Sequence, residues 1–380
     1  LVCFKKTIFA TIKLKHPTLM NIKRLSFILI LVAQNLHLLS LPIPLSRVVA
    51  IEKREEIIHQ WKEQQRIHLL QNIQDCAIRQ DGLIMPFSLQ TFGTTPPDGR
   101  SLYISMHGGG NVATPINDSQ WENQKHLYQP DEGIYICPRA PWDDWDMWFK
   151  PPIDSMIEEL IRTCVTCCGV NPDKVYLMGY SAGGDGVWRL APRMADHWAA
   201  ASMMAGHPGD VGLDNLFNLP FLIWCGQFDN AYNRREEVEK RGKQLDSLQH
   251  KHPQGYVHQT HIIQKKAHWM DLEDKAALPW MSRYHRNPYP RHITWVQEEG
   301  LRNDFYWIGI RLKEAKRGNT VIADIEGNSI MIHRCDYKHL IIYINDLMLN
   351  LDKTIRIVYQ GKIVRSEERR VGKECRSRWS

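Results

Sequence analysis

The sequence predicts an α/β protein, with a mostly parallel sheet covered by helices on both faces and a small C-terminal antiparallel β domain. Between residues 83 and 280, short apolar stretches of strand length alternate with longer stretches of helical periodicity. Such alternation is typical of a parallel sheet buried on both faces. Beyond Pro290 only strand-like stretches remain, with Glu326-Gly327-Asn328 as a hairpin turn between two of them.

The expected elements follow one another after a leading helix at residues 51–73. In the first part, strands are expected at 83–92, 102–106, 133–137, 175–178, 199–204, 221–224 and 257–263, and helices at 153–168, 183–194 and 234–248. In the second part, strands are expected at 292–297, 305–312, 320–325, 329–333, 340–344 and 355–364. The predicted domains are therefore an α/β domain at 51–290 and a β-sandwich-like domain at 291–364.

The two ends of the chain differ from this body. Met20, Lys23 and Arg24 precede the apolar run 25–33, which is too short for a permanent membrane span and is typical of an export signal. Residues 1–50 are therefore predicted to be a signal or leader segment of an exported periplasmic or extracellular protein; an N-terminal membrane anchor is the alternative. Residues 365–380 lack apolar periodicity and are predicted to be a tail outside the native fold.

The charge is also concentrated at the ends. Of the net charge of +6, residues 1–50 carry seven Lys or Arg and no acid, and residues 366–380 carry five Lys or Arg against three Glu. Residues 51–365, the body of the chain, therefore have a net charge of −3. Because nucleic-acid binding requires an excess of positive charge, this value argues against a nucleic-acid partner.

No cofactor or metal is expected from the sequence. Cys164, Cys167 and Cys168 resemble part of a zinc motif, but no second pair follows at a zinc spacing. These cysteines recur with apolar residues at helical spacing, which favours a buried helix face. Clustered histidines between residues 250 and 261 fall on different faces and loops, and no glycine-rich phosphate loop is present.

One motif points to chemistry. Gly179-Tyr180-Ser181-Ala182-Gly183 lies between the strand that ends at Met178 and the helix that begins near Gly183. A G-x-S-x-G element on a strand-to-helix turn is the nucleophile elbow of α/β-hydrolases, and the chain from about residue 83 to 280 resembles that family. The resemblance implies that Ser181 is a nucleophile.

The family order of the triad is serine, acid, histidine, each after a later strand. Asp229 follows the expected strand at 221–224, and His268 follows the strand at 257–263. His268 is therefore expected to act as the general base and Asp229 to orient it. Asp210 and Asp271 remain alternatives for the acid.

A glycine-rich segment is expected to supply the oxyanion hole. Met106-His107-Gly108-Gly109-Gly110 follows the strand at 102–106, where esterases and lipases of this family carry an HGGG-type loop. The backbone N–H groups of Gly108 and Gly109, with that of Ala182, are expected to bind the oxyanion.

Two tryptophans on neighbouring loops are candidates for substrate binding. Trp121 lies in the segment 117–124, and Trp145 lies in the aromatic segment 138–149. Both segments follow strands, where open parallel sheets bind their ligands. Packing within a rigid loop is the competing interpretation for these aromatic residues.

The whole pattern resembles exported bacterial serine esterases of the dienelactone-hydrolase-like and polyhydroxybutyrate-depolymerase-like groups. The resemblance implies a serine hydrolase that cleaves a small-molecule or polymer-linked carboxylic ester through an acyl-enzyme. Dienelactone hydrolases use cysteine where this chain has Ser181, so their substrate cannot be carried over. Two alternatives remain: a serine peptidase of the prolyl-oligopeptidase-like type, and a non-catalytic polysaccharide-binding protein on a hydrolase scaffold.

Overall fold

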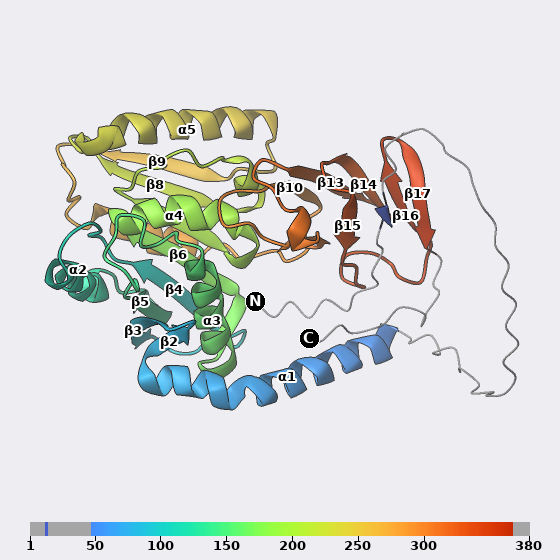
Figure 1. Cartoon of the computed structure of the whole chain (residues 1–380), viewed down its shortest axis with the longest axis horizontal. Helices are drawn as coiled ribbons and strands as arrows, with labels where there is room; N and C mark the ends of the chain where they lie inside the picture. Colours follow the sequence, from blue (N-terminus) through green and yellow to red (C-terminus); the bar gives the residue numbers. More distant parts are fainter. Residues whose placement is uncertain (1–11, 14–46, 368–380) are drawn as a thin grey trace, which may run out of the picture.

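The computed structural model describes residues 12–13 and 47–367, which are arranged around one large sheet (Figure 1). Its eight strands run in the order β2-β3-β5-β4-β6-β7-β8-β9. Their bounds are β2 Ala77–Gln80, β3 Leu83–Phe92, β4 Arg100–Met106, β5 Gly133–Pro138, β6 Val170–Tyr180, β7 Ala200–Met204, β8 Phe221–Gly226 and β9 His258–Ile263. The pairs β2–β3 and β3–β5 are antiparallel, and all other neighbouring pairs are parallel, so the predicted mostly parallel sheet is confirmed.

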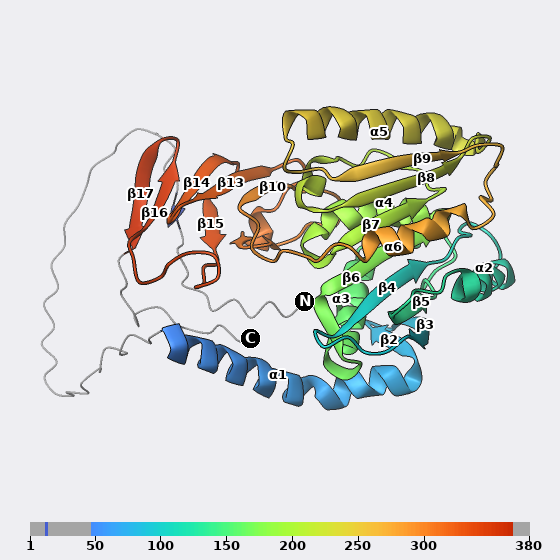
Figure 2. The ribbon, with the colours of Figure 1, turned by 180° about the vertical axis from the view of Figure 1, so that it is seen from behind.

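Helices cover both faces of this sheet because its central strands are apolar on both sides. Along β6, Val175 and Leu177 belong to one core cluster, whereas Tyr176 and Met178 belong to the other. The first cluster is covered by α3 Pro152–Cys167, α4 Ala182–Arg193 and α5 Arg234–Lys251, and the second by α2 Thr114–Leu127 and α6 Ala277–Met281. Figure 1 shows α3 and α4 in front of the sheet, and Figure 2 shows α6 in front of the opposite face.

The leading helix, α1 Arg47–Asp75, packs along α3 at one side of the molecule. The contact includes a hydrogen bond of 3.0 Å from the amide of Asn72 to the hydroxyl of Thr163. The predicted end of the signal or leader segment, at residue 50, falls within α1. The predicted signal segment otherwise lies outside the described residues, apart from the short strand β1 Ile12–Lys13.

The C-terminal part contains two small sheets. One has the order β10-β13-β14-β16-β17, and the other has the order β1-β15-β12-β11. The bounds are β10 His292–Val296, β11 Asp304–Phe305, β12 Ile308–Gly309, β13 Thr320–Glu326, β14 Ser329–Cys335, β15 His339–Ile342, β16 Ile355–Tyr359 and β17 Lys362–Glu367. All pairs are antiparallel except β14 and β16, which are parallel.

Two expected strands are interrupted by turns. Residues 355–364 form a hairpin rather than one strand, because Gln360 and Gly361 adopt left-handed conformations with φ of 50° and 74°. Its second strand continues to Glu367, beyond the expected domain end at residue 364. The stretch 305–312 is broken in the same way at Tyr306, whose φ is 53°. Alternation of apolar residues continues through both turns, and it therefore did not reveal them.

The core is continuous between the two parts. Ile293, Trp295 and Trp307 of the C-terminal part belong to the same cluster of buried side chains as Trp188 and Phe221 of the first part. Strand β10 also contacts the 3-10 helix Asp214–Asn218. The side-chain amide of Asn215 donates to the carbonyl of Val296 at 2.8 Å, and its oxygen accepts from the N–H of Val296 at 2.7 Å. The C-terminal part is thus joined to the first part by apolar and polar contacts.

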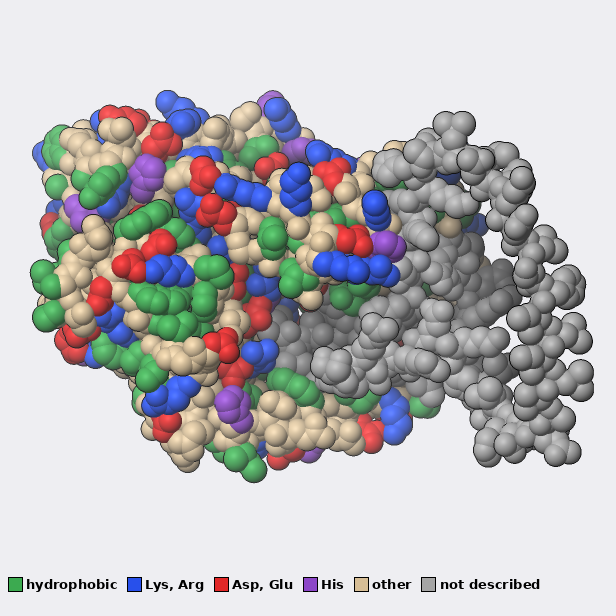
Figure 3. All heavy atoms as spheres, viewed as in Figure 1, with side chains coloured by type: hydrophobic (Ala, Val, Ile, Leu, Met, Phe, Trp, Pro, Cys, Tyr) green, Lys and Arg blue, Asp and Glu red, His purple; other side chains and the backbone are tan. Residues whose placement is uncertain are grey.

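The surface of the described residues carries mixed charge. Figure 3 shows Lys and Arg side chains interspersed with Asp and Glu on the face that it presents. In the part of the chain that the structure describes, no helix combines the length and hydropathy that crossing a bilayer requires.

Candidate active site

Ser181 lies on a sharp turn between β6 and α4. Its φ of 56° and ψ of −119° belong to a region that non-glycine residues rarely adopt, at a typical cost of about 1–3 kcal/mol. The turn requires glycine on both sides. A Cβ on Gly179 would lie 2.4 Å from the carbonyl oxygen of Gly183, and a Cβ on Gly183 would lie 2.1 Å from that of Met106. The fold therefore holds Ser181 at the end of the central strand.

The structure brings Ser181, His268 and Asp229 together. The Nε2 atom of His268 lies 2.9 Å from Oγ of Ser181, and its Nδ1 lies 2.7 Å from Oδ2 of Asp229. Asp229 follows β8 and its side chain is 1% exposed, whereas His268 follows β9 and its side chain is 42% exposed. Because β6, β8 and β9 are parallel, their carboxyl ends meet at one edge, and this arrangement brings the three side chains into contact.

The two alternative acids lie in other contacts. Asp210 binds Arg189 at 2.7 Å and Arg317 at 2.6 Å, and these hydrogen bonds lower the pKa of its carboxyl well below the usual range. Asp271 pairs with Lys266. Only Asp229, among these three carboxylates, bonds to the ring of His268.

Tyr180 holds the loop that carries His268. Its hydroxyl donates to the carbonyl oxygen of His268 at 2.6 Å and accepts from the N–H of Met270 at 3.1 Å. Burial raises the pKa of this phenol, so it remains a donor at neutral pH. Sequence reasoning missed this role, although Tyr180 is the variable residue next to Ser181 in the G-x-S-x-G motif.

Backbone donors converge near Ser181. A Cβ built on Gly108 would lie 3.1 Å from the Cβ of Ser181, so this glycine passes directly beside the serine. Within residues 47–367, the N–H groups of Gly108, Gly109 and Ala182 have no hydrogen-bond acceptor, the last because it opens α4. The N–H of Gly110 is instead bound by Oδ1 of Asn117 at 2.8 Å. Of these N–H groups, that of Gly108 belongs to the residue that passes beside Ser181, and that of Ala182 to its neighbour in the chain.

The side chain of His107 supports the glycine loop at residues 108–110, a role that sequence reasoning also missed. Its Nε2 accepts from the N–H of Ala140 at 3.2 Å, so Nδ1 carries the proton and donates to the carbonyl of Gly108 at 2.6 Å. Trp148 donates to the carbonyl of His107 at 2.8 Å. Burial lowers the pKa of His107 to about 4, which keeps the ring neutral.

The two candidate tryptophans have different surroundings. Trp121 lies on α2, where its Nε1 donates to the carbonyl of Cys137 at 2.9 Å and Lys125 lies 3.7 Å from its ring centre. Its contacts are those of a packing residue. Trp145 is 60% exposed, and its Cα would lie 3.2 Å from a Cβ on Gly110. Of the two, Trp145 borders the oxyanion loop and is open to solvent.

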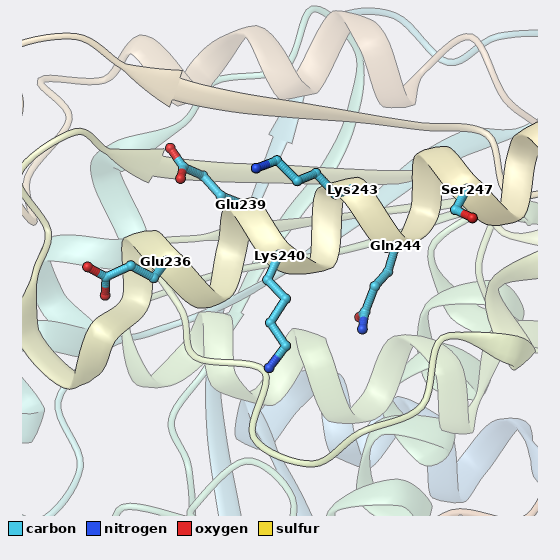
Figure 4. Close-up of a pocket in the computed structure, with 6 residues that line it drawn as sticks. All are labelled: Glu236, Glu239, Lys240, Lys243, Gln244 and Ser247. Carbon is cyan, nitrogen blue, oxygen red and sulfur yellow. The ribbon is translucent and has the colours of Figure 1, made fainter.

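Other groups that the sequence singled out do not join this site. Cys164, Cys167 and Cys168 lie on or next to α3 and form no disulfide. No set of three or more His, Cys, Asp or Glu side chains within the described ranges is arranged to hold a metal ion. A groove on the outer face of α5 is polar and contains none of the site residues (Figure 4); its lining residues are Glu236, Glu239, Lys240, Lys243, Gln244 and Ser247.

The sheet order and the position of the site together decide the fold. Ser181 follows a central strand of the sheet, and Asp229 and His268, which form the hydrogen-bonded series with it, follow later parallel strands. The antiparallel strands lie at the opposite edge of the sheet, as in the α/β-hydrolase fold. The chain has the α/β-hydrolase fold. No protein-family model matches the sequence, and no curated protein matches it either.

Solved structures that are similar to this chain include several esterases. A thermostable esterase is 17% identical with a TM-score of 0.42, and the match covers 55% of this chain and 62% of the esterase. Est1E from Butyrivibrio proteoclasticus is 14% identical with a TM-score of 0.38, covering 55% of this chain and 97% of its own. FphF, a fluorophosphonate-binding serine hydrolase of Staphylococcus aureus, is 13% identical with a TM-score of 0.39. This match covers 54% of this chain and 96% of FphF. This chain thus spans less than two thirds of the length of the first of these structures.

Proposed function

We propose that the chain is a serine hydrolase that cleaves carboxylic esters through an acyl-enzyme intermediate. The observation that carries this proposal is the continuous hydrogen-bonded series from Ser181 through His268 to Asp229, at 2.9 and 2.7 Å. This geometry is the one required for a general base to activate a hydroxyl nucleophile. The non-catalytic alternative gives no reason for a strained serine aligned with a histidine and a buried carboxylate.

The first half-reaction begins when Oγ of Ser181 attacks the ester carbonyl and Nε2 of His268 takes its proton. The charge on the former carbonyl oxygen is stabilised by the N–H groups of Gly108, Gly109 and Ala182, which have no acceptor among the described residues. Asp229 holds Nδ1–H of the imidazole and stabilises its charged form. As the tetrahedral intermediate collapses, His268 donates the proton to the leaving alcohol.

The second half-reaction reverses these roles with water. His268 removes a proton from a water molecule, which attacks the acyl carbon bound to Ser181. Collapse of the second tetrahedral intermediate returns the proton to Oγ and releases the acid. The exposed position of His268, at 42%, allows water to reach Nε2 once the alcohol has left.

The proposal is tested by labelling and by hydrolysis. Purified protein should react with a fluorophosphonate probe and hydrolyse a short-chain nitrophenyl ester with a burst of one equivalent of nitrophenol. Ser181→Ala should abolish both signals while leaving the circular dichroism spectrum unchanged. A folded wild-type protein that is neither labelled nor active would refute the serine-hydrolase assignment.

Substrate preference is proposed at the level of small or polymer-linked esters. Trp145 is exposed beside the oxyanion loop, and a flat ring in this position can stack on an acyl group or a sugar ring. A panel of nitrophenyl esters, acetylated or feruloylated sugars and a prolyl amide distinguishes these classes. Faster cleavage of the amide than of every ester would favour the peptidase alternative.

A further inference from the structure

The carboxylate of Asp229 has two partners, one on each oxygen. Oδ2 binds Nδ1 of His268 at 2.7 Å, and Oδ1 lies 3.5 Å from Nη1 of Arg234. Within residues 47–367, no other group donates a hydrogen bond to this carboxylate. Because its side chain is 1% exposed, water cannot replace a missing partner. A buried carboxylate requires such compensation to remain ionised.

Arg234 is itself buried and has few other contacts. The residue is 8% exposed, and in the described part of the chain its guanidinium donates no conventional hydrogen bond. Its Nε atom is buried without a partner there. The ring of Tyr232 lies 5.0 Å from the guanidinium carbon, on the solvent side, since that ring is 77% exposed. Among the described residues, the carboxylate of Asp229 is therefore the charged partner of the Arg234 guanidinium.

The chain between the two residues is shaped to bring them together. Tyr232 and Asn233 have φ of 57° and 56°, so two consecutive non-glycine residues are left-handed before α5 begins at Arg234. Such conformations are costly and persist only where the surrounding structure holds them. The N–H of Arg235 donates to the backbone carbonyl of Asp229 at 3.2 Å, which closes the loop. The loop thereby places Arg234, the first residue of α5, next to the side chain of Asp229.

Other charged and titratable groups surround this pair. Asp185 on α4 is held by the N–H of His207 at 2.6 Å, and burial raises the pKa of its carboxyl, an effect that the charge of Arg234 opposes. Arg235 pairs with Glu239 at 2.9 Å on the outer side of α5. The full set around the pair is Tyr180, Asp185, His207, Cys225, Arg235 and Glu239.

We propose that Arg234 is a positioning residue for catalysis, which holds Oδ1 of Asp229 so that Oδ2 stays aligned with His268. This inference rests on the proposed serine-hydrolase function. Arg234 acts only through Asp229 and does not touch the reacting atoms. A neutral side chain at position 234 removes a positive charge beside the triad, so the pH profile of activity reports its loss.

The test compares Arg234→Met with Arg235→Met in the full-length chain. Arg235 is the next residue of α5, carries the same charge, is 38% exposed and does not contact the carboxylate of Asp229. Arg234→Met should lower kcat about tenfold or more with little change in KM, and should move the acidic limb of the kcat/KM profile to higher pH by about half a unit. Arg235→Met should leave both quantities within about twofold and 0.2 pH unit of wild type.

Two further variants separate charge from packing. Arg234→Lys keeps the charge and should recover most of the kcat and the wild-type acidic limb, whereas Arg234→Gln keeps length and polarity but should behave like Arg234→Met. In an Asp229→Asn background, Arg234→Met should cause little additional loss of kcat, because the two residues act as a unit. If Arg234→Met does not fold, Arg234→Gln takes its place in every comparison, and Arg234→Lys tests the charge by itself.

The outcomes distinguish this inference from the proposed function. A wild-type protein that resists the fluorophosphonate probe refutes the function, whatever the variants do. If wild type is labelled and active, the inference is overturned by a neutral variant at position 234 with wild-type kcat and pH profile. It is also overturned if Arg234→Lys loses as much activity as Arg234→Gln, or if the losses from Arg234 and Asp229 multiply.

Discussion

At the scale of residues, the proposed reactivity of Ser181 depends on two side chains outside the triad. Tyr180 holds the backbone of His268, and His107 holds the carbonyl of Gly108, each through a hydrogen bond of 2.6 Å. Neither side chain needs to contact substrate. They place the base and the oxyanion donors where Ser181 can use them, which is how a site is preorganised.

Replacing the triad acid should nearly abolish turnover. Asp229→Asn removes the negative charge that stabilises the imidazolium and favours the wrong tautomer of His268, so kcat for a nitrophenyl ester should fall about 10³- to 10⁴-fold. Asp210→Asn is the matched control, because Asp210 pairs with two arginines instead. Normal turnover in Asp229→Asn together with loss in Asp210→Asn would transfer the role to Asp210.

Removing one hydroxyl should separate positioning from stability. Tyr180→Phe deletes the donor to the carbonyl of His268 and should lower kcat about tenfold, with a stability cost of about 1–2 kcal/mol. Tyr176→Phe, on the same strand, deletes an equivalent bond of 2.9 Å to the carbonyl of Tyr284. It should cost similar stability in urea unfolding and leave kcat within about twofold. Equal kcat in both variants would show that Tyr180 does not position the base.

At the scale of elements, α4 links the site to the C-terminal sheets. Its first residue, Ala182, presents a free N–H beside Ser181, and its last, Arg193, binds Asp154 of α3 at 2.5 Å and the carbonyl of Glu299 at 3.0 Å. One end of the helix therefore adjoins Ser181, and the other end is anchored in the contact with the C-terminal part.

The segment after the histidine loop contains a carboxyl group that should titrate near pH 6. Asp274 lies in the 3-10 helix Glu273–Ala276, and its Oδ2 accepts from the hydroxyl of Tyr128 at 2.5 Å. Burial raises the pKa of Asp274 to about 6, above its value of ~3.9 in an unfolded chain. The protonated form therefore stabilises the fold fully below about pH 4, and this contribution is lost as pH rises through 6.

Asp274→Asn should remove this dependence because an amide stays neutral. Between pH 4 and pH 7 the free energy of unfolding of the variant should rise relative to wild type by about 2 kcal/mol, as measured by urea unfolding at each pH. A difference between the two proteins that does not change with pH would contradict the assignment of this titration to Asp274.

At the scale of the whole molecule, buried ion pairs join the α/β body to the C-terminal sheets. Arg302 binds Glu158 of α3 at 2.6 Å and lies 3.8 Å from Asp154, while His197 contacts the same Glu158 at 3.2 Å. The side chain of Arg302 is 12% exposed. Because the apolar core is also continuous here, the C-terminal part is not attached by a flexible linker alone.

Loss of one buried cation should therefore destabilise the whole chain. Arg302→Met removes one cation from Glu158 and Asp154, which then keep only His197 and Arg193, and should lower the free energy of unfolding by about 2 kcal/mol. Arg317→Met provides the control: Arg317 also connects the two parts, through Asp210, and pairs with Glu299 of its own part, but its side chain is 46% exposed. That change should cost at most about 1 kcal/mol.

The readout is a single thermal or urea transition followed by circular dichroism and by ester hydrolysis. If the two parts form one cooperative unit, Arg302→Met should shift both signals together. Early loss of the spectroscopic signal of the C-terminal strands, with activity retained, would instead show that the sandwich unfolds independently. That outcome would support the separable module at 291–364 that the strand pattern predicts.

The sequence by itself determined the fold class and the candidates for the site. The α/β alternation and the serine motif between β6 and α4 are local patterns, because periodicity and tight turns depend on neighbouring residues. Asp229 and His268 could be proposed because the family that the chain resembles carries its acid and its histidine, in that order, after later strands of the sheet than the serine. Turns inside alternating segments, as at Gln360, were not predicted, because the alternation passes through them.

Only the tertiary structure decided which groups support the site and how the two parts meet. Arg234 reaches Asp229, Tyr180 reaches the carbonyl of His268, and Arg302 reaches Glu158 across 144 residues of sequence. Each contact depends on where a loop turns and on whether water is excluded around a charged or polar side chain. The burial of these side chains and the directions in which they point arise from the packing of the whole chain, and no local pattern of residue types predicts them.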